Sequence, residues 1–204
     1  MNIAVIDNYD SFTYNLVQIL RALNGGQVEV FRNDRFQISD LERFDALVLS
    51  PGPGLPKQAG LLMETINYFW RSKPILGVCL GHQAICEYFG ASLRCLDTVY
   101  HGVSSSIEID TTQAYFEGLP PQIHVGRYHS WVVDKNSLQE PLIPIAFDKN
   151  QEIMAVYHID RPILGVQFHP ESIMTPKGKQ LIQQFLKTTI QQTQNDERKE
   201  QVYP

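Results

Sequence analysis

Short apolar runs in the first half of the chain constrain its fold more than any other feature of the sequence. Each run is about four residues long and mostly aliphatic, as expected for strands buried on both faces of a parallel sheet. Helical patterns lie between the runs, and this alternation predicts an α/β fold with helices on both faces of the sheet. The predicted strands are Ile3–Ile6, Val28–Phe31, Ala46–Leu49 and Ile75–Val78.

The second half changes character and predicts antiparallel or mixed additions to that sheet. Its strand-like segments, joined by short turns, are Val103–Ile109, His129–Val133, Ile153–His158 and Ile163–Phe168. A last helix is predicted from about Pro176 to Gln191, because proline favours the first turn of a helix. We therefore expect one domain over residues 1–192 and a polar, flexible tail over residues 193–204.

Composition excludes several classes of protein. Hydrophobic residues make up 43% of the chain, which is too many for a disordered protein, and the net charge of -5 argues against non-specific nucleic-acid binding. No apolar run is long enough to span a bilayer, and no basic leader precedes the first strand. Three cysteines give neither a disulfide framework nor zinc-ligand spacing. We expect a cytoplasmic protein with free thiols and no metal site.

One cysteine occupies a distinctive position, in Gly77-Val78-Cys79-Leu80-Gly81. A buried strand meets a helix there, with glycines two residues before and after the cysteine, as in a nucleophile elbow. The helix dipole favours the thiolate, and the backbone N–H of Leu80 could receive an oxyanion. Cys86 and Cys95 have no such frame, so we interpret them as ordinary structural residues.

A nucleophilic cysteine needs a base and a group that orients the base. His169 is the best candidate for the base, because it follows a predicted buried strand and precedes Pro170 and Glu171. In extended backbone, residues two apart point the same way, so the carboxylate of Glu171 could reach the imidazole. His82 and His129 are the rival histidines. No acid follows His82 closely, and His129 lies in a strand pattern that suits a core or supporting residue.

The segment Ser50-Pro51-Gly52-Pro53-Gly54 follows the third predicted strand and should lie at the same edge of the sheet as Cys79. Its prolines fix the loop and its glycines allow a ligand close to the backbone. The N–H of Gly54 is a candidate second oxyanion donor. A phosphate-binding loop is excluded by the glycine spacing and the lack of a following Lys-Ser/Thr.

Together these segments resemble the class I (triad) glutamine amidotransferases, whose fold is similar to that of flavodoxin. More narrowly, they resemble the glutaminase subunits of anthranilate synthase and aminodeoxychorismate synthase. The resemblance runs from near residue 3 to near residue 190. The matching segments, in order, are residues 7–15 (DNYDSFTYN), 50–54 (SPGPG), 77–83 (GVCLGHQ), 127–130 (RYHS) and 169–172 (HPES).

The resemblance implies a chemistry for these residues. Cys79 would attack the side-chain amide of glutamine, His169 would transfer protons and Glu171 would orient His169. The N–H groups of Gly54 and Leu80 would hold the oxyanion, and water would hydrolyse the resulting thioester. The residues that would hold glutamine are Gly52, Pro53, Gly54, Gln83, Ser130 and Trp131.

The resemblance also implies a partner. Ammonia would pass to a large chorismate-binding synthase subunit in tryptophan or folate biosynthesis, or both, with no cofactor in this chain and Mg²⁺ only in the partner. Neither nucleic acid nor membrane is an expected partner. Val103 and Trp131 depart from the lysine and leucine of many relatives, and the first could alter contacts at the rim of the site.

Three other functions stay open at this level. A stand-alone cysteine hydrolase of γ-glutamyl or related amide bonds would be active without a partner. An amidotransferase serving a nucleotide synthetase would share the fold and the triad. A non-catalytic regulatory subunit would keep only the fold, which an intact Cys79, His169 and Glu171 set makes the weakest of the three.

Overall fold

The computed structural model describes the backbone of residues 1–202 and the side chains of residues 1–191, and it has eleven strands and four α-helices. The strands are β1 Ile3–Asp7, β2 Val28–Arg32, β3 Ala46–Leu49, β4 Ile75–Val78, β5 Leu93–Cys95, β6 Val103–Ile109, β7 Gln122–Arg127, β8 Trp131–Val133, β9 Leu142–Asp148, β10 Ile153–His158 and β11 Ile163–Val166. The helices are α1 Thr13–Leu23, α2 Leu62–Phe69, α3 Leu80–Tyr88 and α4 Gly178–Val202, with 3₁₀ turns at Ile38–Leu41, Pro56–Gln58 and Ala114–Phe116.

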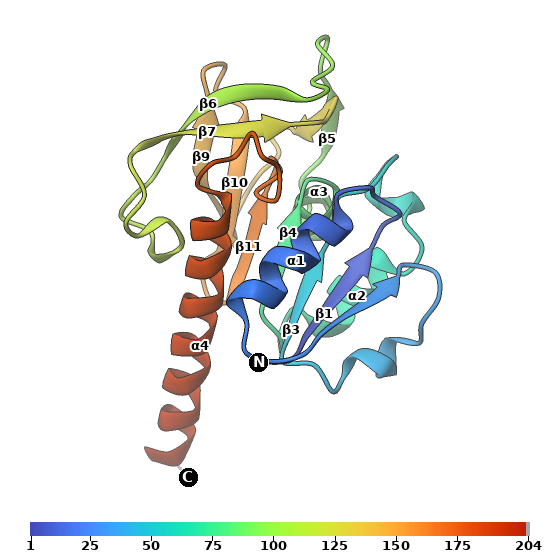
Figure 1. The fold of residues 1–204 in the computed structure, drawn as a ribbon, viewed down its shortest axis with the longest axis vertical. Coiled ribbons are helices and arrows are strands. Elements are labelled where there is room, and N and C mark those ends of the chain that lie inside the picture. The colour runs from blue at the N-terminus through green and yellow to red at the C-terminus, as the bar shows by residue number, and fades with distance from the viewer. Residues whose placement is uncertain (203–204) are drawn as a thin grey trace.

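Most strands join one nine-stranded sheet in the order β2-β1-β3-β4-β11-β10-β9-β6-β7 (Figure 1). The first five of these strands are parallel to one another and, with the four helices, form what we call the parallel half. All four strands predicted in the first part of the chain are present within one residue of their expected ends. The carboxyl ends of β1, β3, β4 and β11 meet at one edge of the sheet, where parallel-sheet proteins carry their sites.

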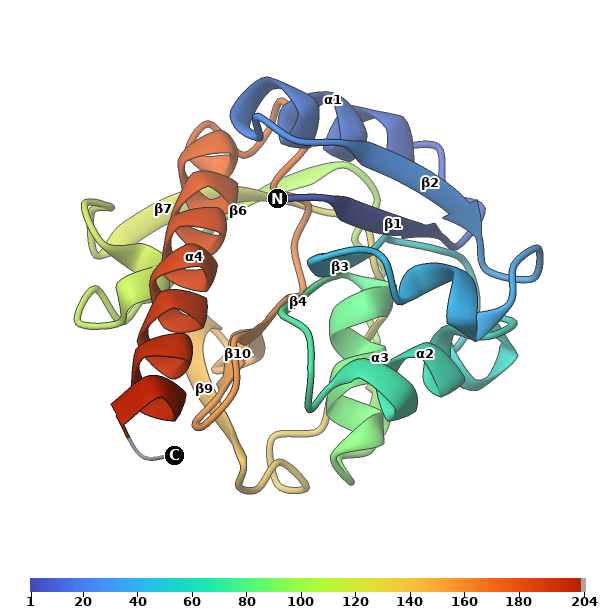
Figure 2. The same ribbon diagram turned by 90° about the horizontal axis from the view of Figure 1, so that it is seen from below.

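The helices cover both faces of the parallel half, as the alternating pattern predicts (Figure 2). On one face α1 and α4 lie over a buried cluster that includes Leu16, Leu20 and Phe185. On the other face α2 and α3 lie over a second cluster that includes Ile66 and Ile85. The sheet is therefore apolar on both sides, which accounts for the unbroken aliphatic runs of its strands.

The remaining main-sheet strands, β10, β9, β6 and β7, pair antiparallel and, with the small β5–β8 sheet, form the antiparallel half. The segment 129–133 was expected to extend the main sheet, but only its last three residues form a strand, which pairs with β5 instead. Strands β5, β7 and β9 were not anticipated. Pro144 lies inside β9, and proline in a sequence argues against a central strand because it cannot donate to the ladder.

Helix α4 is longer than the sequence analysis predicts. It begins at Gly178 and continues to Val202, eleven residues beyond Gln191, because most of the polar residues that follow are good helix formers and no Gly or Pro interrupts them. A flexible tail was predicted for residues 193–204. The side chains of these residues, and the backbone of residues 203–204, lie outside the described part of the chain. No helix in that described part is long and apolar enough to cross a membrane.

Candidate active site

Cys79 forms a strained turn between β4 and α3. Its backbone has φ 51 and ψ −99, a conformation that non-glycine residues seldom adopt and that clusters at functional sites. The N–H of Cys79 donates to the carbonyl of Val166 in β11 at 2.8 Å, which anchors the turn to the neighbouring strand. A Cβ on Gly81 would overlap the backbone carbonyl of Leu49, so the second glycine of the elbow is required for α3 to approach the sheet.

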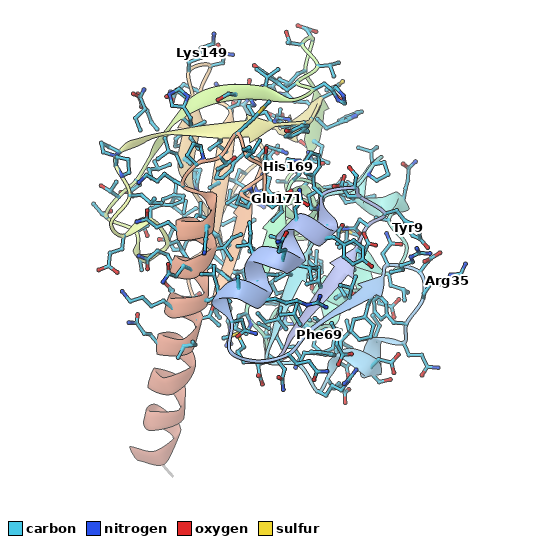
Figure 3. The ribbon with its side chains drawn as sticks, in the orientation of Figure 1. Tyr9, Arg35, Phe69, Lys149, His169 and Glu171 are labelled. Atoms are coloured by element: carbon cyan, nitrogen blue, oxygen red, sulfur yellow. The ribbon has the colours of Figure 1, made fainter. Side chains whose placement is uncertain are left out.

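His169 and Glu171 follow β11 and face the same site. Nδ1 of the imidazole donates to Oε1 of the carboxylate at 2.7 Å, and both side chains are buried. The imidazole is packed by the rings of Phe12 and Tyr128, whose centroids lie 5.3 and 4.8 Å away. Figure 3 shows His169 and Glu171 together near the carboxyl edge of the sheet. These contacts fix the orientation of the His169 ring and leave Nε2 free to exchange a proton.

The electrostatics of His169 favour its protonated form. Burial lowers the pKa of His169, but the nearby Cys79 sulfur and the Glu171 carboxylate outweigh burial and raise that pKa to about 10. Nε2 is buried and has no hydrogen-bond partner among the described residues. Because Nδ1 is taken by Glu171, Nε2 is the nitrogen available to accept the thiol proton of Cys79.

A cavity of about 250 Å³ opens beside the cysteine. It brings together the cysteine and all six residues that were expected to hold glutamine, from the loop after β3, helix α3 and the segment before β8. Its lining is Gly52, Pro53, Gly54, Cys79, Gln83, Tyr128, His129, Ser130 and Trp131. Leu80 opens α3, and the first N–H groups of a helix have no intrahelical acceptor, so its N–H is available at this end.

The wall of this cavity formed by the antiparallel half rests on a buried ion pair. Arg127 is 1% exposed and donates from Nη1 to Oδ2 of Asp148 at 2.6 Å. Nε of the same guanidinium donates to Nε2 of His129 at 3.2 Å, and the ring of Tyr100 lies 3.6 Å from its Cζ. Burial and the Arg127 charge lower the pKa of His129 to about 3, so His129 is neutral. It supports the cavity and is not placed as a base.

The other candidates from the sequence lie elsewhere. His82 is buried between α3 and β11, where burial lowers its pKa to about 3. Cys86 is buried one turn further along α3, and burial raises the pKa of its thiol. Cys95 is exposed on β5. Among the side chains of residues 1–191, no group of three or more His, Cys, Asp and Glu is arranged to hold a metal ion.

Sequence reasoning did not assign the residues that support the site from a distance. Phe12 and Tyr128 lie inside segments that we quoted, but their packing on His169 depends on loops far apart in the chain. Asp148 lies in the unanticipated β9, so its pairing with Arg127 could not be read from a local pattern. Gln167 lies two residues before His169, and its Nε2 is 3.6 Å from the sulfur of Cys79. Only its position at the end of a strand hinted at a role.

The geometry agrees with comparisons with known proteins. The family model "Glutamine amidotransferase class-I" matches residues 4–189, and the chain belongs to this family. A Bacillus subtilis protein named aminodeoxychorismate/anthranilate synthase component 2 is 47% identical to it, over 91% of this chain and 96% of the relative. Anthranilate synthase component 2 from Saccharolobus solfataricus is 43% identical, over 89% and 96%.

A solved structure shows the same fold. The crystal structure of a Thermoplasma acidophilum protein, described as one subunit of a GMP synthase, superimposes with a TM-score of 0.86 and 28% identity. The superposition covers 97% of this chain and 98% of that protein. The expected α/β class, a mostly parallel sheet flanked by helices with antiparallel additions, is confirmed.

Proposed function

We propose that this chain is the glutamine-hydrolysing subunit of a chorismate-using synthase. The observation that carries the proposal is the strained Cys79 beside the buried His169–Glu171 pair, on the wall of a cavity sized for a small ligand. The site joins a thiol nucleophile on the cavity wall, a base next to that thiol with one oriented nitrogen, and two backbone segments that can donate to an oxyanion. Such a set suits acyl transfer through a thioester.

In the first half of the reaction, the thiol proton of Cys79 passes to Nε2 of His169. The sulfur then attacks the side-chain carbonyl carbon of glutamine, and the N–H groups of Gly54 and Leu80 stabilise the oxyanion. As the tetrahedral intermediate collapses, the C–N bond breaks and His169 gives its proton to the departing nitrogen. Ammonia leaves, and a γ-glutamyl thioester stays on Cys79.

In the second half, water attacks the thioester carbonyl while His169 takes a proton from it. The C–S bond breaks, glutamate leaves and the thiol is restored. Glu171 holds the imidazole and favours its charged form throughout, as the raised pKa of His169 supports. The α-amino and α-carboxylate groups of glutamine would lie against Gln83 and the Ser130–Trp131 backbone. The reaction needs no cofactor in this chain.

The relatives support a proposal for the partner and the pathway. This chain is 47% and 43% identical to two proteins named as synthase component 2, but only 28% identical to the GMP synthase protein. The higher identities favour a chorismate-using synthase over a nucleotide synthetase as the partner. The product pathway would be tryptophan or folate biosynthesis, or both, in the cytoplasm, and Mg²⁺ would be needed only by the partner.

The synthase would dock around the mouth of the cavity, because ammonia must pass into it without reaching bulk water. Exposed apolar side chains lie on segments next to residues of the site. Ile173, 95% exposed, lies two residues after Glu171, and Tyr9 lines a hollow that also includes Pro53. Val99 lies beside Tyr100, whose N–H donates to the carbonyl of His129.

The test is glutamate release from glutamine by the full chain, alone and with the synthase of the same cell. We expect strong stimulation by the synthase, loss of glutamate release in Cys79→Ala, and rescue of that variant's product formation by ammonium salts. Ile173→Asp should weaken association while basal hydrolysis is kept. Its matched control is Ile159→Asp. The side chain of Ile159 is 51% exposed and lies in the turn between β10 and β11, at the edge of the sheet opposite the carboxyl ends of the parallel strands.

High activity of the chain alone, without response to either synthase, would instead favour a stand-alone cysteine hydrolase. Unchanged glutamate release in Cys79→Ala would show that Cys79 is not the nucleophile, and it would favour a non-catalytic regulatory subunit. Failure of ammonium salts to bypass Cys79→Ala would contradict the transfer of ammonia.

A further inference from the structure

We propose that Gln167 is a further catalytic residue, whose side-chain amide donates a hydrogen bond to the sulfur of Cys79 and stabilises the thiolate. This inference rests on the proposed role of Cys79 as nucleophile. Gln167 follows β11 directly and its side chain is fully buried. Its Nε2 lies 3.6 Å from Sγ of Cys79, and its backbone N–H is held by the carbonyl of Met154 at 2.9 Å.

The neighbours of the amide fix which of its ends faces the sulfur. Nε2 of Gln83 donates to the backbone carbonyl of Trp131 at 2.9 Å, and a carbonyl can only accept. The same Nε2 lies 3.1 Å from Oε1 of Gln167, to which it donates its second proton. With its oxygen occupied by Gln83, Gln167 must turn its NH₂ group towards Cys79.

A permanent charge fixes the donor directions on the other side of the Trp131 carbonyl. Arg127 is always protonated, so its Nε–H donates to Nε2 of His129 and leaves the ring proton on Nδ1. Nδ1 then donates to the carbonyl of Trp131 at 3.0 Å, the carbonyl that also receives Gln83. Asp148 holds the guanidinium in place. The donor directions are therefore determined on both sides of this carbonyl, by the charge of Arg127 on the His129 side and by the carbonyl itself, which can only accept, on the side of Gln83 and Gln167.

The chemical consequence is a stabilised charge on sulfur. When the thiol proton passes to Nε2 of His169, the sulfur becomes an anion, and a hydrogen-bond donor favours the charged form of its partner. Gln167 moves no proton itself, unlike His169. The other titratable groups packed around this position are Glu171, paired with His169, and the neutral His82 and His129.

The experiment measures the alkylation rate of Cys79 by iodoacetamide from about pH 5 to about pH 10, in the full chain without any partner. A Cys95→Ser background removes the exposed thiol, and mass spectrometry of the Cys79 peptide reports the site. Gln167→Met keeps an unbranched side chain but removes the donor. Because hydrogen bonds to ionised groups are among the stronger ones, we expect the midpoint of alkylation to move up by about one pH unit.

Steady-state kinetics supply the second readout. In the presence of the synthase, Gln167→Met should lower kcat for glutamate release by about tenfold and leave KM for glutamine nearly unchanged, since the donor acts on the sulfur rather than on bound glutamine. Gln180→Met is the matched control. Gln180 lies at the start of α4, and its Nε2 donates to the carbonyl of Gly118 in an exposed hydrogen bond. No residue of the cavity takes part in this bond, so neither quantity should move.

An unchanged alkylation midpoint in a folded Gln167→Met protein would overturn the inference and leave the proposed function intact. If that variant does not fold, as judged by circular dichroism, Gln167→Leu carries the same expectation and the same contradiction. A wild-type Cys79 that resists alkylation at every pH would overturn the proposed function and this inference together.

Discussion

The two halves of the molecule build the site by different physical means. The parallel half places Cys79 and His169 at the carboxyl ends of adjacent strands, between two apolar clusters that hold the sheet from both sides. The antiparallel half supplies the opposite wall of the cavity through a buried ion pair, Arg127–Asp148, and the neutral His129. Sheet topology and apolar burial position Cys79 and His169, whereas a polar cluster positions the surface that would hold glutamine.

This difference has energetic consequences. Apolar burial is non-directional and adds up over many side chains, so no single contact decides it. A buried ion pair depends on both partners, because removing one leaves an uncompensated charge in the interior. The parallel half should therefore tolerate changes at its reacting residues without unfolding, while the antiparallel half should not tolerate the loss of one charge.

The largest expected effect is on chemistry in the parallel half. Cys79→Ala should lower partner-stimulated glutamate release by roughly 10⁴-fold or more, because the nucleophile is lost. Thermal unfolding followed by circular dichroism should change little, since a small side chain replaces a small one. Loss of folding would show that Cys79 is needed for core packing. The proposed difference between the two halves would then be wrong.

The next effect separates the two groups that serve the cysteine. Glu171→Gln should reduce kcat less than His169→Ala, because orienting the imidazole is a smaller demand than transferring its protons. Steady-state rates of glutamate release in the presence of the synthase provide the measurement. An equal or greater loss in Glu171→Gln would mean that the carboxylate does more than orient the ring.

The antiparallel half should show the largest effect on stability. Asp148→Asn keeps the volume of the side chain but leaves Arg127 without its counter-charge, and the expected loss is about 3–5 kcal/mol in the free energy of unfolding. Glu117→Gln is the matched control. It breaks the surface pair with Lys187, whose side chain is 51% exposed, and should cost less than about 1 kcal/mol. Urea titrations measure both, and similar losses would contradict the distinction.

The smallest effect concerns acid stability. Burial lowers the pKa of His82 to about 3, opposed by a hydrogen bond with the backbone of Gly165. Because the unfolded chain takes up this proton near pH 6.5 and the folded chain does not, the group contributes full stability above pH 6.5 and loses it as pH falls towards 3. His82→Leu should remove a slope of about 1 kcal/mol per pH unit in that window.

The measurement is the free energy of unfolding of both proteins at several pH values between about 6.5 and 4. Parallel curves for wild type and His82→Leu would show that the histidine does not titrate differently on unfolding. His129 gives the contrast between the halves. Its ring bonds to Arg127 and Trp131, so His129→Leu should cost stability at neutral pH as well.

The parallel half could be predicted well because its signals are local. A four-residue aliphatic run identifies a buried strand, and the glycines around Cys79 identify the elbow. The antiparallel half could not be predicted as well. Strand β9 was not predicted because it contains Pro144, and β8 pairs with β5 rather than with the main sheet. The end of α4 was predicted eleven residues too early, because the polar residues after Gln191 lack the apolar stripe that marks a helix in a sequence.

The sequence by itself determined the family of this protein. The order of its motifs defined that family, and Cys79, His169 and Glu171 could be proposed as its reacting residues because each lies beside a strand end within a short, recognisable pattern. Tertiary structure alone decided which residues support them. Phe12 reaches His169, Asp148 reaches Arg127, and Gln167 reaches the sulfur, across separations of many residues. A pattern reports only neighbours in the chain, whereas buried polar groups take whatever partners the packing of distant strands brings within hydrogen-bond reach.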